Sequence, residues 1–340
     1  MYNKALQTFL RKLLVLSLPM VVLFLCYAAI DPFKTIGHYE RYFDDRVAHV
    51  SLNMDFVSTE NFVNRNPVQH YNAFIFGNSR SQYWQTGYWQ KFIGDSSRCY
   101  HYYGNGESLY SMTNNIQFIH NSGNRIDHAL FVVDVSLLRM TEPMTGHLSC
   151  TPPRVVGYRN ILKFHATNFV AFLNPLFAYT YIDLRLTKTL KPYMLERFLI
   201  EQPVVYHPNS NEVVDEMFDR AIANGTYYTE KRMLRFHNKQ YPDSVSEPVL
   251  FQKNIRMLTE IAHILRQHHT QYKVIINPLF DQIRFNPTDL QVLQDIFGKQ
   301  NVYDFSGKNA INSDYRNYYE DSHYRPIIAR QLMDSIYSRQ

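Results

Sequence analysis

Cysteine and the usual metal-binding motifs are scarce in this sequence. Only 3 cysteines occur among 340 residues, and no Cys-x-x-Cys, His-Glu-x-x-His or calcium-loop pattern is present. A disulfide-dense scaffold and a structural zinc domain are therefore excluded. Cys99 and Cys150 could pair in an oxidising compartment or remain buried free thiols. His263, His268 and His269 lie on a predicted amphipathic helix, where we expect a solvated face and not a metal site.

Glycine and internal repeats are also sparse. The chain has 12 glycines, no repeat and no low-complexity tract, so it is neither a disordered nor a repeat protein. Aromatic residues are instead abundant, with 26 Tyr and 23 Phe in a chain that is 45% hydrophobic. This composition is enough for one sizeable core, or for a core with a large insertion.

Charge is missing from one long run near the N-terminus, Leu13 to Ile30. The run is just long enough to span a bilayer, which takes about 20 apolar residues. Lys4, Arg11 and Lys12 precede it, so the positive-inside rule predicts a cytoplasmic N-terminus and an extracytoplasmic remainder. We therefore predict a single-pass membrane protein whose tail and anchor occupy residues 1–31.

The apolar run could instead be a cleaved signal peptide or a buried core helix. Ala28 and Ala29 could form a weak cleavage site, although signal-peptide cores are only about 7 to 15 residues long. A core helix would be covered by the rest of the chain. Large residues before Cys26 argue against lipid attachment.

The net charge gives no indication of a nucleic-acid partner. The formal charge is +5, but three of the basic residues precede the apolar run. The remaining chain is close to neutral, whereas a nucleic-acid-binding domain usually carries a basic face.

Short apolar runs alternate with helical patterns after about residue 70, which is typical of an α/β protein with a parallel sheet and helices on both faces. The predicted strands are 73–76, 99–102, 130–135, 273–277 and 302–305. Helices are predicted at 250–265 and 286–298, because apolar residues recur there at helical spacing. Residues 32–70 are predicted to form a connecting region.

The alternation breaks down between about residues 141 and 249, where aromatic-rich helical segments follow one another. We interpret this stretch as a large helical insertion that caps the site. Its basic residues Arg185, Lys188, Lys191 and Arg197 could lie against the membrane surface or form an ordinary solvated helix face.

A candidate nucleophile follows the first predicted strand, in YNAFIFGNSRSQYW, Tyr71 to Trp84. In open parallel sheets ligands bind beyond the carboxyl ends of the strands. Gly77 allows a tight turn there, and Ser79 would begin the following helix, where free N–H groups can stabilise an oxyanion. The alternative is an ordinary helix-capping serine.

A candidate base and acid occur near the other end of the chain, in NYYEDSHYRP, Asn317 to Pro326. A nucleophilic serine needs a base to take its proton, and a histidine base needs a carboxylate to hold its tautomer. His323 with Glu320 or Asp321 supplies both groups from one segment. An exposed loop with an incidental histidine is the alternative.

The early strand-Gly-x-Ser and the late acid-x-x-His together resemble the SGNH/GDSL hydrolase superfamily. The order FGNSRS, YYGNGES, VVDVS, VIINPL, YDFSG and YYEDSHYRP is similar to membrane-anchored members such as the D-alanyl-lipoteichoic acid biosynthesis and alginate O-acetylation proteins. The resemblance covers residues 71–139 and 272–335 but not the insertion. It implies a three-layer, flavodoxin-like sheet in an extracytoplasmic SGNH-like domain at residues 71–340.

The resemblance also implies roles for the candidate residues. Ser79 would be the nucleophile, His323 the general base and Glu320 the acid three residues before it. The family usually has Asp at that position, and Asp321 lies only two residues before the histidine, so either carboxylate could serve.

The implied oxyanion hole consists of the Ser79 backbone and the loop Gly104 to Gly106, and Arg80 is a further candidate for substrate binding. The family's Gly-x-Asn block is not evident, because Asp134 and Ser136 follow the third predicted strand. Asn105 could replace the missing asparagine. A literal Gly-Asp-Ser string at residues 94–96 is interpreted as a loop, because a helical segment precedes it.

By this resemblance the protein is an O-acyltransferase or esterase, acting through a Ser-His-acid triad on a cell-surface or exported glycan of a bacterial envelope. Acetyl is the expected acyl group, and no cofactor or metal is expected. An acyl donor, a glycan acceptor and an integral-membrane acyltransferase would be its partners. The alternative, favoured by the unusual third block and by Glu320, is a non-catalytic glycan-binding or assembly protein with the same fold and anchor.

Overall fold

Five parallel strands form the central sheet in the computed structural model, which describes residues 2–43, 49–189, 191–194, 199–200, 205–214, 216–236 and 244–338. The strands are β2 (Ala73–Gly77), β3 (Cys99–Tyr103), β4 (His128–Val133), β8 (Gln271–Ile276) and β9 (Val302–Asp304). All five coincide with predicted strands, which confirms the α/β class. Their spatial order is β3-β2-β4-β8-β9, which is the flavodoxin-like order. The second strand lies on one side of the first, and the remaining strands are added on the other side.

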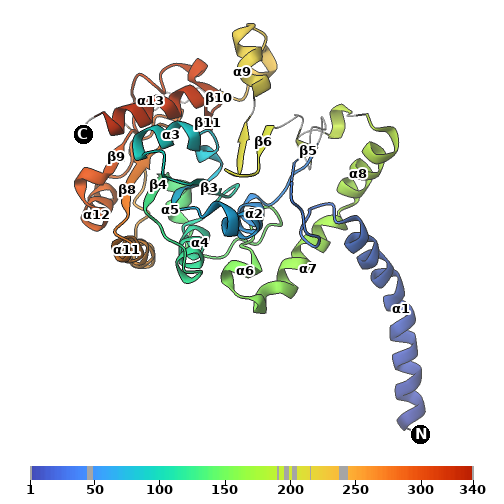
Figure 1. Ribbon diagram of the computed structural model, residues 1–340. Helices are drawn as coiled ribbons and strands as arrows, with labels where there is room; N and C mark the ends of the chain where they lie inside the picture. Colours follow the sequence, from blue (N-terminus) through green and yellow to red (C-terminus); the bar gives the residue numbers. More distant parts are fainter. Residues whose placement is uncertain are drawn as a thin grey trace.

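Helices cover both faces of the sheet (Figure 1). One face carries α2 (Met54–Gln69), α4 (Leu109–Asn121), α11 (Gln252–Gln267) and α12 (Pro287–Phe297), and the other carries α3 (Thr86–Ile93) and α13 (Pro326–Tyr337). Alternate residues of β2 serve the two faces, because Phe74 and Phe76 pack in the first layer while Ala73 and Ile75 pack in the second. The strands are therefore buried on both sides, as parallel strands usually are.

The predicted connecting region at residues 32–70 contains the long helix α2. Its N-cap is Asn53, whose side chain accepts a hydrogen bond from the Phe56 backbone N–H. Phe62 packs against Phe74, with ring centroids 6.0 Å apart. The second half of this region is thus a layer of the body and not only a connection.

Helices predominate between residues 141 and 249, but short strands also occur there. After α5 (Val135–Arg139), the elements of this region are α6 (Pro153–Val156), α7 (Ile161–Phe172), α8 (Pro175–Thr187), β5 (Leu199–Ile200), β6 (Val205–His207), β7 (Glu212–Val214), α9 (Glu216–Ala223) and α10 (Glu230–Met233). β5 pairs with β1 (His49–Val50). The β6–β7 hairpin covers the edge of β3, because the Ser210 carbonyl accepts from the His101 N–H and the Asn211 amide donates to the His101 carbonyl.

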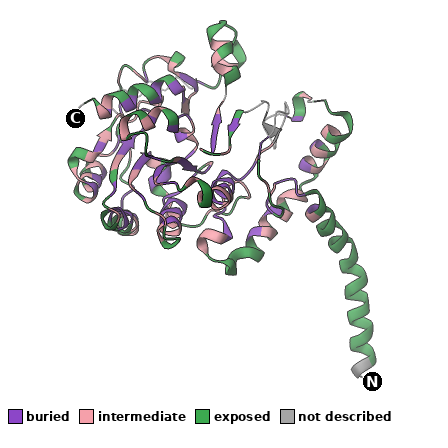
Figure 2. Cartoon of the chain, in the orientation of Figure 1, coloured by how far each residue is buried: buried purple, intermediate pink, exposed green. Residues whose placement is uncertain are grey.

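The N-terminal helix α1 (Tyr2–Ile30) projects from this body. Its span Lys4–Ile30 is long and apolar enough to cross a membrane. Figure 2 shows it exposed along almost its whole length, so it is not the core helix considered from the sequence. An exposed apolar helix of this length has the dimensions of a membrane span, and a signal sequence near the N-terminus has the same properties.

Candidate active site

Ser79 follows β2 at a point where two strands approach closely. A Cβ atom on Gly77 would lie 2.7 Å from the Val132 carbonyl oxygen of β4 and 2.7 Å from the Ser81 Cβ. Only glycine fits there, because any side chain would collide with these atoms. Backbone conformation is not the cause, because the φ of Gly77 is not in the left-handed region. The glycine therefore lets the serine turn lie directly against the neighbouring strand.

The helix expected directly after Ser79 is only a short 3-10 turn, Ser79–Ser81, and α3 does not begin until Thr86. The helical segment that begins at Ser79 is thus a single 3-10 turn and not the first turn of a long helix. Asn78 fixes this turn, because its side-chain oxygen accepts a hydrogen bond of 3.0 Å from the Arg80 N–H. The serine is positioned by a capped turn beyond the carboxyl end of β2.

The C-terminal segment reaches the same place as a small antiparallel hairpin, β10 (Tyr318–Glu320) and β11 (His323–Tyr324). The Tyr318 hydroxyl donates to the Pro278 carbonyl at 2.5 Å, and the Tyr324 hydroxyl donates to the Asn277 side chain at 2.7 Å. Both acceptors follow β8, so the hairpin is tied to the carboxyl end of the sheet. Glu320 stands opposite His323 in the register of the hairpin.

Ser79, His323 and Glu320 form a continuous hydrogen-bonded chain. The Ser79 Oγ lies 2.8 Å from the His323 Nε2, and the His323 Nδ1 is hydrogen-bonded to the Glu320 Oε1. The second carboxylate oxygen of Glu320 accepts from the Ser322 N–H at 3.0 Å. The histidine and glutamate side chains are 28% and 23% exposed, so the chain is accessible from solvent.

The environment of Glu320 keeps this side chain ionised. Burial acts to raise its pKa, but the hydrogen bond and the charge of His323 outweigh it and lower the pKa to about 2. An ionised carboxylate on Nδ1 favours a proton there, which leaves Nε2 free to accept the Ser79 proton. Asp321, the other candidate acid, accepts a hydrogen bond of 3.2 Å from the Ser322 hydroxyl.

Arg80 lies beside the serine, but its guanidinium is bonded to the end of β4. Its Nη1 lies 2.7 Å from the Asp134 Oδ2 and 2.9 Å from the Ser136 Oγ. The Asn78 side chain donates to the same Asp134 oxygen at 2.7 Å. Burial acts to raise the pKa of Asp134, but the Arg80 charge and these hydrogen bonds lower it overall. Asp134 and Ser136, which follow the third predicted strand, thus connect the loop after β2 with the loop after β4.

The predicted glycine loop lies directly beside the serine turn. The Gly104 N–H donates to the Gly77 carbonyl at 3.4 Å, so it is already used within the protein. Among the described residues, the backbone N–H groups of Ser79, Asn105 and Gly106 donate to no protein acceptor. The Ser79 N–H and the two N–H groups of the neighbouring loop are therefore candidate donors to an oxyanion at the serine.

Two buried carboxyl groups lie beneath this loop. A Cβ atom on Gly104 would be 2.5 Å from the Glu107 Oε2 and 3.2 Å from the Asp55 Cβ. Burial, then the charge of Asp55, raises the pKa of Glu107 well above its usual range, and burial raises the pKa of Asp55 to about 7. Sequence reasoning missed this pair, because Asp55 lies in the segment taken for a connection.

A second serine–histidine pair lies below the turn but is fully buried. The Ser81 Oγ lies 3.0 Å from the His101 Nε2 and donates to the Asn78 carbonyl at 2.7 Å. Burial lowers the pKa of His101 to about 3, so this ring stays neutral. Neither side chain is exposed, and the pair supports the turn that carries Ser79. No feature of the sequence distinguished it.

The remaining candidates lie apart from the triad. Ser96 of the Gly-Asp-Ser string is exposed in a loop after α3, as predicted, and Cys99 and Cys150 are free thiols. His120 Nδ1 and His268 Nε2 are 2.9 Å apart. Within the described ranges, no group of three or more metal-ligating side chains occurs.

No known family model matches this chain, and no curated protein matches it. The chemistry of the site is therefore argued from its own geometry. A serine, a histidine and an ionised carboxylate in hydrogen-bonded sequence, with free backbone donors alongside, can activate a hydroxyl for attack on a carbonyl.

Proposed function

We propose that this protein is a membrane-anchored, extracytoplasmic acyl-ester enzyme of the SGNH type. The observation that carries the proposal is the hydrogen-bonded chain from the Ser79 Oγ through His323 to Glu320. It lies at the carboxyl end of β2, where the strand order reverses and α/β proteins bind ligands. A nucleophile, a base and a carboxylate in this order are the requirement for acyl transfer through a serine.

In the first half of the reaction the His323 Nε2 takes the Ser79 proton as the Oγ attacks the carbonyl carbon of an acyl ester. The backbone N–H groups of Ser79, Asn105 and Gly106 are the donors available to the tetrahedral oxyanion. The protonated imidazole is stabilised by Glu320 and then gives its proton to the departing alcohol oxygen. The product of this half is an acyl ester of Ser79.

In the second half an acceptor hydroxyl gives its proton to His323 as its oxygen attacks the carbonyl carbon of the acyl-enzyme. The bond from that carbon to the Ser79 Oγ then breaks, and His323 returns the proton to the Oγ, which restores the free serine. A sugar hydroxyl as acceptor makes the protein an O-acyltransferase, whereas water makes it an esterase. We propose a cell-surface or exported glycan as the acceptor and acetyl as the acyl group, on the basis of the motif resemblance. The anchor would hold Ser79 near a membrane-bound acyl donor or an integral-membrane acyltransferase.

Acyl-enzyme trapping tests the proposal. The full chain in detergent is incubated with p-nitrophenyl acetate and examined by peptide mass spectrometry, beside Ser79→Ala, His323→Ala and the matched control Ser96→Ala. We expect an acetyl group on the Ser79 peptide, its loss in Ser79→Ala, slower turnover in His323→Ala and no change in Ser96→Ala. A folded protein with neither adduct nor turnover would favour the non-catalytic glycan-binding or assembly role.

A further inference from the structure

Helix α7 packs one side on the protein and leaves an apolar opposite side uncovered. Phe164 and Asn168 on the inner side are buried. Leu162, Ala166 and Val170 recur every four residues on the other side and are all exposed, Leu162 by 82% and Val170 by 67%. The side of a helix that faces water normally carries polar residues. The exposed side of α7 is apolar, so its composition does not match contact with water.

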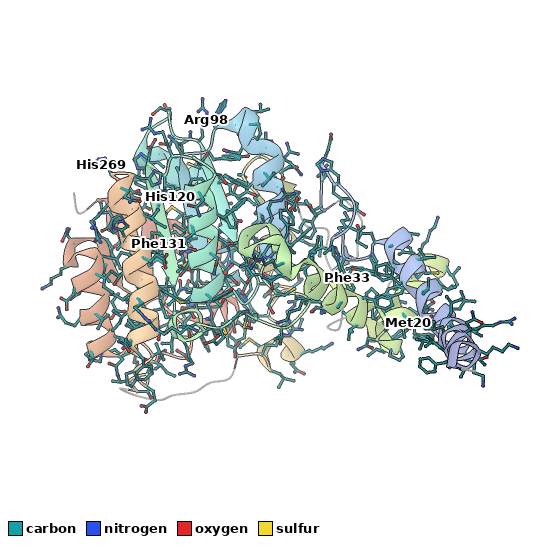
Figure 3. All side chains as sticks on the ribbon, turned by 90° about the horizontal axis from the view of Figure 1, so that it is seen from below. Met20, Phe33, Arg98, His120, Phe131 and His269 are labelled. Carbon is teal, nitrogen blue, oxygen red and sulfur yellow. The ribbon has the colours of Figure 1, made fainter. Side chains whose placement is uncertain are left out.

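The position of α7 points to the medium that does fit. Its C-terminal part packs on the end of α1, because the Phe169 ring lies 5.4 Å from that of Phe24 and 5.6 Å from that of Tyr27. Figure 1 shows α7 running crosswise from this junction. In Figure 3, seen from below, the green helices near Phe33 lie between the sheet and α1. The helix thus lies level with the point where α1 leaves the body.

The charges around α7 suit an anionic membrane surface. No Asp or Glu occurs from residue 143 to residue 182, while the basic residues Arg159 and Lys163 lie in that stretch. Lys163 and Arg159 are exposed. Basic side chains beside an apolar helix face are typical of helices that lie in the boundary between headgroups and acyl chains.

We propose that α7 lies in the interfacial layer of the bilayer that α1 crosses, with Leu162, Ala166 and Val170 in contact with lipid that includes anionic phospholipid. The continuous apolar surface from α1 to α7 is the reason for assigning lipid as the occupant. The proposal depends on α1 crossing the membrane and is independent of the chemistry of Ser79.

This second membrane contact would fix the tilt of the body. The Phe164 ring stacks on Phe56 of α2, with centroids 5.3 Å apart, and Arg154 pairs with Glu60 of α2 at 2.8 Å. α2 in turn carries Asp55, which lies beneath the glycine loop beside the serine. The contact therefore holds the candidate active site at one height above the bilayer, which a single helical tether would not do.

In the basic cluster considered from the sequence, Arg185 and Lys188 are exposed. Lys191 pairs with Asp183 at 2.7 Å and Arg185 bonds the Tyr181 hydroxyl at 2.8 Å, while Arg197 lies outside the described residues. α8 leads away from the junction with α1 (Figure 1). Its Leu186 is 80% exposed and supplies a control matched to Leu162 in residue type and exposure.

Depth-dependent fluorescence quenching tests the proposal with the full chain in nanodiscs of three parts phosphatidylcholine to one part phosphatidylglycerol. Cysteines are introduced singly as Leu162→Cys, Val170→Cys and Leu186→Cys in a Cys26→Ser background and labelled with an environment-sensitive dye. Burial raises the pKa of Cys99 to about 12 and that of Cys150 to about 11, which keeps both slow to react. The Cys26→Ser parent measures any residual labelling.

We expect lipids with a shallow spin label to quench the dye at residues 162 and 170 at least several-fold more than at residue 186, and aqueous iodide to show the opposite order. Equal quenching at all three positions would overturn the proposal. Shielding from iodide without quenching by lipid would also overturn it, because it would assign the face to a protein contact. Since two positions on one face are read, a single poorly folded variant does not decide the result.

Discussion

Glu320 stands opposite His323 across the β10–β11 hairpin, and this pairing directs the imidazole at a serine 244 residues earlier in the chain. The acid and the base come from adjacent strands that are only two residues apart at the turn. Their geometry is therefore local, whereas the contact with Ser79 depends on the docking of the whole hairpin on the end of β8. The Glu320–His323 pair is thus fixed by the hairpin itself, whereas the contact of His323 with Ser79 is fixed by the packing of the hairpin on the sheet.

The choice of acid gives the first prediction. Glu320→Gln removes the charge that holds the His323 tautomer, and we expect ester turnover to fall by about 10²- to 10⁴-fold. Asp321→Asn should retain turnover to within about threefold, because the carboxylate bonded to His323 is kept. Steady-state hydrolysis of p-nitrophenyl acetate measures both variants. The reverse ranking would assign the acid role to Asp321.

The two serines of the turn should separate activity from stability. Ser79→Ala is expected to lower turnover by about 10³-fold or more, with a free energy of unfolding within about 0.5 kcal/mol of the parent. Ser81→Ala removes the hydrogen bonds to Asn78 and His101 and should destabilise by about 1–3 kcal/mol. Denaturant unfolding measures the stabilities. A stable, fully active Ser79→Ala protein would contradict the proposed function.

Arg80 was predicted to bind substrate, whereas its ion pair with Asp134 indicates a role in holding the turn. Removing one partner of such a pair costs about 3–5 kcal/mol when the other stays buried and charged, and Asp134 is 2% exposed. We expect Arg80→Ala and Asp134→Ala each to be destabilising, and the double variant to be much less destabilised than their sum. Unchanged stability with a raised KM in Arg80→Ala would instead support substrate binding.

The buried carboxyl pair predicts how stability depends on pH. Folding raises the pKa values of Glu107 and Asp55, that of Asp55 to about 7. A group with a raised folded pKa contributes full stability below its unfolded pKa of about 4 and loses it as pH rises through the folded pKa. We therefore expect the contribution of this pair to stability to fall as pH rises from about 4 through 7. His101 acts in the opposite direction over the same range, because its lowered pKa makes folding more favourable as pH rises, so the contribution of the pair is measured as a difference between variant and parent.

Glu107→Gln should lessen this fall, because it removes one buried acid and the charge beside the other. Its melting temperature is expected to exceed that of the parent at pH 8 and to match it near pH 4. Thermal unfolding across this range measures the difference, with the exposed Glu230→Gln as the control for a surface charge. Parallel curves for Glu107→Gln and the parent would contradict the interpretation of the pair.

Sequence periodicity located the five strands and the two long helices α11 and α12, because buried parallel strands and amphipathic helices each leave a local pattern. It did not identify α2 as a layer, since that helix mixes Asn, Asp and Thr with its apolar residues. Many of those polar side chains are buried with partners on β3, as where Thr59 meets the Tyr102 hydroxyl at 2.6 Å. Because the buried side chains are polar, they do not produce the helical spacing of apolar residues from which a buried helix is predicted.

The sequence by itself determined the apolar N-terminal helix and the residue types of the candidate site. A serine after a glycine-ended strand and a histidine three residues after a glutamate are local arrangements that a sequence displays directly. The tertiary structure alone decided that His323 meets Ser79, that Arg80 turns inward to Asp134, and that Asp55 lies under the glycine loop. Each of these contacts joins distant segments at the carboxyl edge of one sheet, and their approach is set by strand order and packing, which no local pattern encodes.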